Sequence, residues 1–186
     1  MKFFKIYIFI IIINFVSIAF AAVQSNKNVA KIAVVDVESI LENSLAIANI
    51  KGSINALGES IQDELTQKEK EFKKREQELI ELQKTLPKEK FDSLVNNFNQ
   101  SINQAQKNFK IKKLALEQAH SRGIEKVQKT ILTIIGELAK KHDFNTVLPS
   151  THVLFIKDEL NITNEVLSTL NARLVEVPID YEKLLK

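Results

Sequence analysis

The chain has 186 residues, with no cysteine and no tryptophan, and its formal net charge is +3. The absence of cysteine excludes a disulfide framework and thiolate chemistry. Two of the positive charges, Lys2 and Lys5, precede the first acidic residue, so the rest of the chain is close to neutral. A near-neutral chain lacks the basic footprint of a nucleic-acid-binding protein.

The N-terminal segment has the pattern of a cleaved export signal. An apolar run over residues 6–20 follows the two lysines, and Ala19 and Ala21 form the small-x-small pattern that signal peptidase recognises. Residues 1–21 are therefore predicted to be a signal peptide, with Ala22 as the first mature residue. The alternative is an uncleaved anchor, but the apolar run is short for a membrane span of about 20 residues.

A short strand and a short helix are predicted next. Residues 32–35 form a compact apolar run rich in β-branched residues, which is typical of a buried strand. Asp36 follows directly, and its side chain can cap a short helix over residues 37–43.

A long helical hairpin is predicted over residues 44–142. In its first arm, apolar residues recur every seven positions on a charged background, at Leu65, Phe72, Leu79 and Leu86. This spacing makes one narrow apolar seam on a helix. Pro87 cannot continue that helix, so the second arm is expected to begin near Lys88 and to fold back along the first. At 1.5 Å per residue the two arms would be about 60 and 80 Å long.

The C-terminal part has the pattern of a small sheet with one helix. Residues 144–148 and 153–156 are predicted strands, separated by a turn. Thr163 is the predicted N-cap of a helix that runs to about Arg173. Residues 175–186 show no pattern from which an element could be placed.

No catalytic, cofactor or metal site is predicted. His120, His142 and His152 are isolated from one another, and no two histidines have the four-residue spacing of a helical metal site. The glycines of the first arm are not followed by the lysine and Ser/Thr of a phosphate-binding loop. The sequence is therefore predicted to be that of a non-enzymatic protein without cofactors.

Five segments, taken in chain order, resemble one known family. They are residues 31–36, 40–44, 140–148, 153–155 and 161–167, and a Glu/Lys/Gln-rich hairpin separates the second from the third. In this order they resemble the Skp (OmpH-like) family of periplasmic chaperones, and the resemblance extends to about Leu174. Its most specific part is the strand-turn-strand pattern followed by Ile-Thr-x-Glu-Val-Leu.

The resemblance implies an α+β fold, in which a long antiparallel helical hairpin projects from a small β-sheet body. It also implies a jellyfish-like homotrimer in the periplasm, whose arms surround a cavity that holds unfolded outer-membrane proteins without ATP. Independently of the resemblance, short strands leave unpaired edges and a narrow seam buries little surface, so self-association is expected. The alternative function is that of a structural or adaptor coiled-coil protein of the cell envelope.

The residue patterns and the resemblance together divide the chain into four parts. These are a signal peptide (1–21), a discontinuous β body that also joins the copies (22–43 and 143–174), a helical arm (44–142) and a C-terminal tail (175–186). The predicted core of the body and of the oligomer consists of Ile32, Val34, Val35, Phe144, Val147, Leu148, Val153, Phe155 and Leu167.

A chaperone of this kind needs an apolar surface that is adhesive without being specific. The arm residues predicted to contact a client are Phe72, Leu79, Leu82, Phe91, Leu94, Phe98 and Phe109. The alternative is that these side chains only close the seam between the two helices. Phe91 and Leu94, which lie nearest the tip, are the strongest candidates for client contact.

A basic surface is predicted on the second arm, at Lys107, Lys110, Lys112, Lys113, Arg122 and Lys126. One interpretation is a solvated face that pairs in part with the more acidic first arm. The other is a lining that attracts acidic clients or makes transient contact with an anionic membrane surface. Such an attraction would weaken as the salt concentration rises.

Overall fold

The computed structural model describes residues 30–185. The chain divides into two units between Lys31 and Ile32, and every element described below belongs to the second unit. The predicted signal peptide, residues 1–21, and the predicted cleavage site before Ala22 lie outside the described residues. None of the helices within residues 30–185 is long and apolar enough to cross a membrane.

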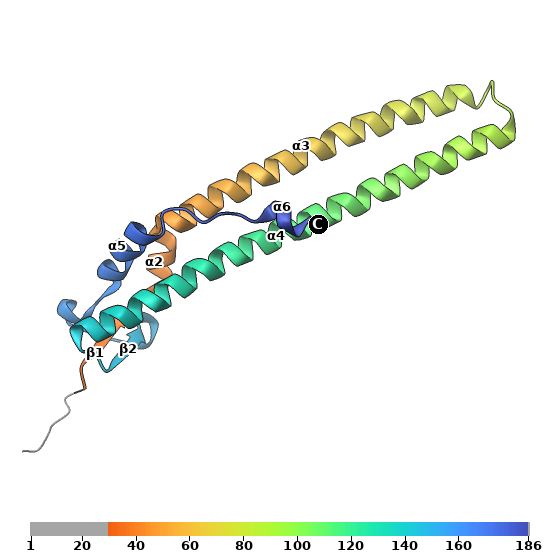
Figure 1. Cartoon of the computed structure of the whole chain (residues 1–186). Coiled ribbons are helices and arrows are strands. Elements are labelled where there is room, and N and C mark those ends of the chain that lie inside the picture. Colours follow the sequence, from red (N-terminus) through yellow and green to blue (C-terminus); the bar gives the residue numbers. More distant parts are fainter. Residues whose placement is uncertain (1–29, 186) are drawn as a thin grey trace, which may run out of the picture. The chain divides into compact units, whose positions relative to one another are not determined.

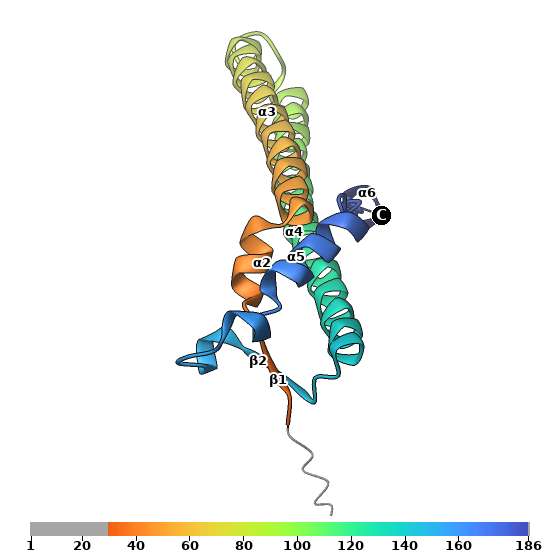
Figure 2. The same ribbon diagram turned by 90° about the vertical axis from the view of Figure 1, so that its left-hand side faces the viewer.

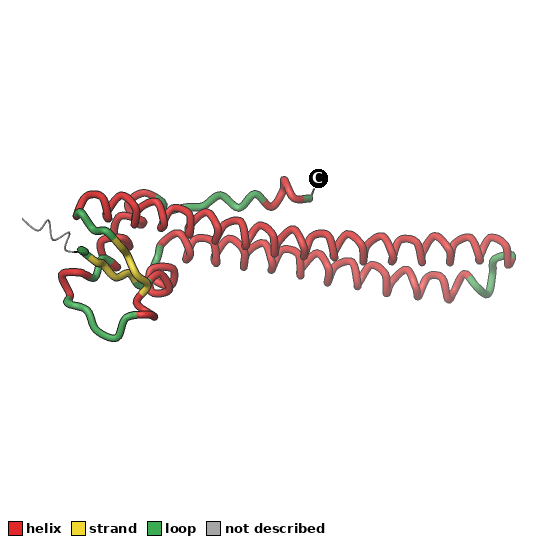
Figure 3. The backbone as a smooth tube through the Cα atoms, turned by 90° about the horizontal axis from the view of Figure 1, so that it is seen from below, coloured by secondary structure: helices red, strands yellow, loops and turns green. Residues whose placement is uncertain are grey.

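A two-stranded parallel sheet forms the base of the described unit. Strand β1 (Ile32–Val35) pairs with β2 (Thr146–Pro149), with Ile32 opposite Thr146 and Val35 opposite Pro149. Parallel strands need a long crossover connection. Here the connection contains helix α2 (Val37–Asn43) and both arms of the hairpin. The sheet thus brings the two ends of the hairpin together, as Figure 3 shows.

The strand predicted at residues 153–156 is wrong. These residues form a loop between two short 3-10 helices, η1 (Ser150–His152) and η2 (Asp158–Leu160). The second edge of β1 is taken instead by the chain after η2, where the Ile162 amide donates to the Val34 carbonyl at 2.9 Å. The 153–156 segment therefore has no place beside β1.

Of the two helix caps predicted near the sheet, one is confirmed and one is wrong. The predicted Asp36 cap is confirmed, because its Oδ1 accepts a hydrogen bond from the Ser39 amide at 2.9 Å. The predicted Thr163 cap of helix α5 (Thr163–Arg173) is wrong. The Thr163 amide donates to Oδ1 of Asn161 at 3.0 Å, while the Thr163 hydroxyl accepts from the Asp36 amide at 2.9 Å. Thr163 therefore joins α5 to the β1–α2 turn.

The hairpin consists of α3 (Leu45–Leu82) and α4 (Lys88–His142), as Figure 1 shows. With 38 and 55 residues, the helices are about 57 and 82 Å long at 1.5 Å per residue. Pro87 lies directly before α4, and its carbonyl accepts from the amides of Lys90 and Phe91. The predicted hairpin and its turn are therefore confirmed.

Burial is concentrated where the hairpin meets the base. The fully buried large side chains come from α2, α3, α4 and α5, namely Ile40, Ile50, Val127, Ile131, Ile134, Val166 and Leu170. Helix α5 packs against both α2 and α4 there (Figure 2). Farther out, Leu79 is buried in α3, and the other apolar seam residues of the arms are only half-buried or exposed. We call residues 61–114 the outer hairpin.

The C-terminal tail, for which no element is predicted, has a defined place. Residues 175–180 run in extended form along α4 and end in a single helical turn, α6 (Tyr181–Leu184). Val177 and Tyr181 of this segment are buried, at 2% and 6% exposure. The tail therefore packs against the hairpin through these side chains.

Candidate functional site

The described residues contain no group of three or more His, Cys, Asp or Glu side chains that could hold a metal ion. The surfaces that could act on another molecule are instead extended ones. They are the half-buried aromatic seam of the outer hairpin, the basic side of α4 and the exposed apolar loop at the base.

Aromatic side chains meet across the outer hairpin. The rings of Phe72 in α3 and Phe98 in α4 lie edge to face, with centroids 5.9 Å apart and planes at 78°. This geometry is favourable for an aromatic pair. Both side chains remain only half-buried, so each ring also presents part of its surface outward.

An open groove lies between the two arms beside this pair. Its apolar lining consists of Leu65, Phe72, Ile102, Ala105 and Phe109, and its volume is about 320 Å³. The polar residues at its border are Lys68, Glu69 and Gln106. The arrangement can accept an apolar side chain of another molecule, with the polar groups confined to its border.

The seven side chains predicted to contact a client all lie in the outer hairpin. Leu79 is buried at 8% exposure, whereas Leu82 is 38% exposed. The remaining five are half-buried, and Phe91 and Leu94 are those nearest the tip among them. Half-burial means that each of these five side chains is partly covered and still exposes apolar surface.

The six predicted basic residues do not form one patch. Lys112 is drawn into the hairpin, where it forms an ion pair with Glu64 of the opposite arm and lies 6.0 Å from the Phe109 ring centroid. Lys107, Lys110 and Lys113 are exposed on α4. Pairing between the arms thus occurs at Lys112, while the neighbouring lysines face solvent.

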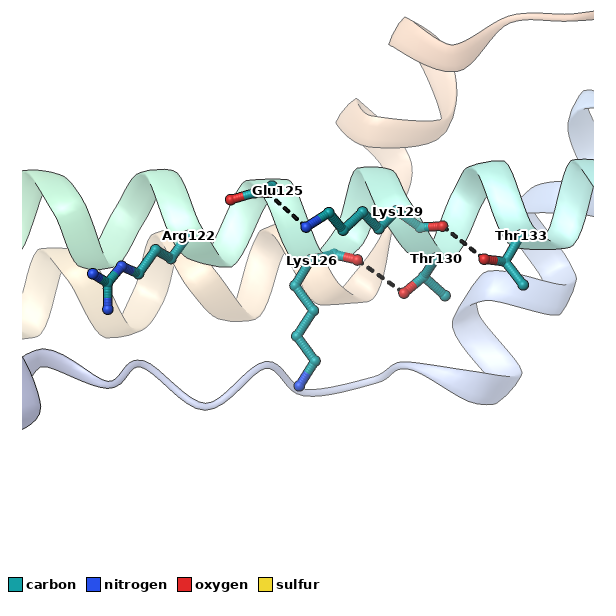
Figure 4. A pocket seen from close by; sticks show the side chains of 6 residues that line it. All are labelled: Arg122, Glu125, Lys126, Lys129, Thr130 and Thr133. Carbon is teal, nitrogen blue, oxygen red and sulfur yellow. Dashed lines mark hydrogen bonds and ion pairs between the residues drawn. The ribbon is translucent and has the colours of Figure 1, made fainter.

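Arg122 and Lys126 lie nearer the base, where they line a shallow hollow of about 400 Å³ (Figure 4). The hollow also contains Lys129, which is not among the six predicted basic residues, together with Glu125, Thr130 and Thr133. Lys129 pairs with Glu125 at 2.7 Å and, through this hydrogen bond, lowers the pKa of the Glu125 carboxyl. Arg122 and Lys126 thus remain the two cations of this hollow that have no carboxylate partner within 4.0 Å.

The residues predicted for the body core are distributed unevenly. Val34 and Val35 are buried, and Phe144, Val147, Leu148, Val153 and Leu167 are half-buried. Ile32 and Phe155, predicted for the core of the body and of the oligomer, are exposed in the single chain, at 39% and 84%. Leu154 beside Phe155 is fully exposed. Leu154 and Phe155 are exposed because residues 153–156 form a loop and not a strand.

Ion pairs hold α5 to the end of α4. The Glu165 carboxylate accepts from Lys141 Nζ at 2.8 Å and lies 3.0 Å from His142 Nε2. The Lys141 hydrogen bond, followed by that of His142, lowers the pKa of Glu165. Arg173 at the other end of α5 pairs with Glu137 at 2.6 Å. These contacts fix the base from which the hairpin projects.

The described fold is that of an α+β protein in which a long helical hairpin projects from a small parallel sheet. A family model described as outer membrane protein (OmpH-like) matches residues 31–170. Because this match covers more than half of the chain, the chain belongs to the OmpH-like family.

A solved structure has the same fold. It is the crystal structure of a candidate outer membrane chaperone (OmpH-like) from Caulobacter crescentus CB15, with a TM-score of 0.73 and 14% sequence identity. The match covers 81% of this chain and 89% of that chain. No curated protein sequence matches the chain significantly. The likeness confirms the α+β fold expected from the sequence.

Proposed function

We propose that this protein is an ATP-independent holdase chaperone of the periplasm, which binds unfolded outer-membrane proteins between its arms and prevents their aggregation. Membership of the OmpH-like family supports this function. The observation that carries it is the half-buried aromatic seam of the outer hairpin, with its open apolar groove. Exposed contiguous apolar surface marks sites that bind other macromolecules.

The seam suits a client that has no fixed shape. Phe72 and Phe98 offer apolar area along the arm, and charged side chains such as Lys68 border it. Burial of apolar surface is non-directional, and its free energy is roughly proportional to the area removed from water. Many different unfolded segments can therefore gain comparable binding energy on the same arm.

The first test measures aggregation of a barrel protein. The purified chain from Ala22 onward is expected to prevent the aggregation of a urea-unfolded outer-membrane protein after dilution, without nucleotide. About one trimer per barrel protein should suffice, and light scattering measures the aggregation. Equal scattering with and without the chain would disprove the holdase function.

A pair of substitutions then locates the client contact. The variant F91S/L94S is expected to capture less barrel protein, because it removes the two half-buried predicted contact residues that lie nearest the tip. Asn96→Ser, an exposed change on the same helix, is the matched control and should leave capture unchanged. If F91S/L94S instead loses its oligomeric state, these side chains serve the assembly and not the client.

Self-association belongs to this function, because a single hairpin encloses no cavity. At the base, Leu154 and Phe155 expose their side chains on one loop, and Ile32 is partly exposed on β1. A second copy would remove this apolar surface from water. The OmpH-like resemblance implies three copies.

The oligomer is tested by measuring the mass in solution. The variant L154S/F155S is expected to shift the protein from trimer to monomer, because it removes the apolar side chains that a neighbouring copy would cover. Ile80→Ser, an exposed change in the outer hairpin at 54% exposure, is the control and should keep the trimer. A trimer that persists in L154S/F155S would place the interface elsewhere.

A further inference from the structure

The C-terminal tail lies outside the segment that matches the family, which ends at residue 170. It runs along α4 as an extended chain over residues 175–180, as Figures 1 and 3 show. Its side chains alternate between buried and exposed. Val177, Ile179 and Tyr181 face the hairpin, whereas Pro178 and Asp180 are exposed. This is the two-residue period of a β-strand that buries one face.

The groove under the tail is shaped by small residues of α4. Tyr181 packs with Ala115 and Ala119, at a point where Leu57 and Ile61 of α3 also contribute. One turn nearer the base, Gly123 lies under Ile179.

Gly123 leaves little space for a side chain between α4, Ile50 and the tail. A Cβ atom there would be 3.2 Å from Ile50 Cδ1 and 3.5 Å from Ile179 Cδ1. Gly123 thus allows the extended tail to lie close to α4. We call the apolar groove under the tail, formed by Ala115, Ala119 and Gly123 of α4 with Leu57 and Ile61 of α3, the channel.

Apolar side chains, more than polar groups, hold the tail in this channel. Within the described residues, a single hydrogen bond joins residues 175–185 to the rest of the chain, from the Val177 amide to Asn49 Oδ1 at 3.4 Å. The short ion pair of Asp180, at 2.7 Å, is made with Lys183 of the tail itself. The contact between tail and hairpin therefore consists mainly of apolar side chains at alternate positions.

Charge complements this contact. The exposed side of the tail carries Asp180 beside a hollow of about 310 Å³, which Arg122 and Lys126 line from α4. Lys183 is the main cause of the lowered pKa of the Asp180 carboxyl, and Arg122 and Lys126 add smaller effects. In Figure 4 the Lys126 side chain reaches toward the ribbon of the tail.

We propose that this channel binds an extended strand of an unfolded barrel protein, and that the tail occupies it until such a strand displaces it. Membrane barrel strands alternate apolar and polar residues, and aromatic residues flank their apolar band. The tail carries the same pattern, with Val177, Ile179 and Tyr181 on one face. The inference rests on the proposed function for the nature of the client.

The experiment uses a labelled peptide with the sequence of residues 175–185 and the full chain from Ala22 onward. The variant Tyr181→Ser weakens the resident tail, and it is expected to bind the peptide at least tenfold more tightly than the unchanged chain. Val175→Ser, at a tail position that is 56% exposed, is the matched control and should bind like the unchanged chain.

A blocking variant makes the assay specific for the channel. Adding Ala119→Phe to Tyr181→Ser fills the channel and is expected to abolish peptide binding. Should Tyr181→Ser alter the fold, which circular dichroism would detect, Ile179→Ser opens the same channel and replaces it. Equal peptide binding by the unchanged and opened chains, or binding that persists with Ala119→Phe, would overturn the proposal.

Tyr181 also reports on its own displacement. The chain has no tryptophan and two tyrosines, and the other, Tyr7, lies in the predicted signal peptide. A barrel-strand peptide of alternating apolar residues, without Tyr or Trp of its own, should therefore increase acrylamide quenching of the tyrosine fluorescence. A peptide of the same composition, with its apolar residues grouped together, should not.

The result separates the two proposals. If a strand binds without a change in the quenching of Tyr181, the channel proposal is wrong and the holdase proposal is unaffected. Displacement of the tail by a chain that fails to prevent barrel aggregation overturns the holdase and leaves the channel intact.

Discussion

At the scale of single residues, Glu165 joins α5 to the end of α4 through Lys141 and His142. These partners lower the pKa of its carboxyl, the Lys141 hydrogen bond most. The stabilisation is therefore present above the ordinary carboxyl pKa of 4.5 and is lost as the pH falls through the lower value in the folded chain. All three side chains are more than a third exposed, so solvent screening keeps the effect small.

We expect Glu165→Gln to lower the free energy of unfolding at pH 7 by less than about 1 kcal/mol. Urea denaturation should show the difference shrinking as the pH falls below 4.5, because the unchanged chain then loses the same charge. Glu159→Gln is the control, since its contact with Lys157 is longer, at 3.8 Å, and more exposed. A loss that is the same at pH 7 and at strongly acidic pH would show that charge is not the cause.

Prediction of single residues from the sequence succeeded where the interaction is local. The Asp36 cap involves an amide three residues away, so the pattern contains all the information needed. The role of Thr163 could not be predicted, because its hydroxyl accepts from the Asp36 amide, 127 residues earlier. Pairing of the basic surface with the first arm was one of the two interpretations, and the sequence did not indicate that Lys112 and Glu64 would be the pair.

At the scale of elements, the outer hairpin depends on pairs across its seam. The Phe72 and Phe98 rings meet edge to face at 5.9 Å. In a double-mutant cycle of the two alanine variants, we expect a coupling of about 0.5–1.5 kcal/mol in the free energy of unfolding.

A matched cycle shows whether the coupling is specific to this pair. Phe91 is half-buried in the same helix as Phe98, and Phe72→Ala combined with Phe91→Ala should give additive losses. If the losses are also additive in the Phe72 and Phe98 cycle, each side chain contributes to stability only through its own burial, and the contact between the rings adds nothing. The measurement is chemical denaturation followed by helical circular dichroism.

The strand predicted at residues 153–156 illustrates the limit of local pattern. An apolar, β-branched run has the composition of a strand, but a strand also needs a free edge beside it. Asn161 and Ile162 already take the second edge of β1. The run does not pair with the outer edge of β2 either, and it forms a loop that exposes Leu154 and Phe155.

At the scale of the whole described unit, one hydrophobic core joins the sheet to the part of the hairpin nearest to it. Ile134 of α4 is fully buried in a cluster that also contains residues of β1, α2, α3, α5 and the tail. We expect Ile134→Ala to lower the free energy of unfolding by about 2–5 kcal/mol, because it removes methyl groups from a packed interior and leaves a cavity.

The control lies two residues away on the same helix. Leu132 is 66% exposed, and Leu132→Ala should change the free energy of unfolding by no more than about 0.5 kcal/mol. Thermal and urea denaturation of both variants provide the measurement. Comparable losses in the two variants would show that Ile134 does not belong to a common core.

The sequence by itself determined the hairpin, its turn at Pro87, the strand at residues 32–35 and the family. Helical period, proline geometry and caps act over a few residues, so they can be read without knowing the rest of the chain. Only the tertiary structure decided which segment pairs with each edge of β1, which apolar residues stay exposed and where the tail lies. These outcomes depend on contacts between residues more than a hundred positions apart, whose geometry is set by the hairpin between them.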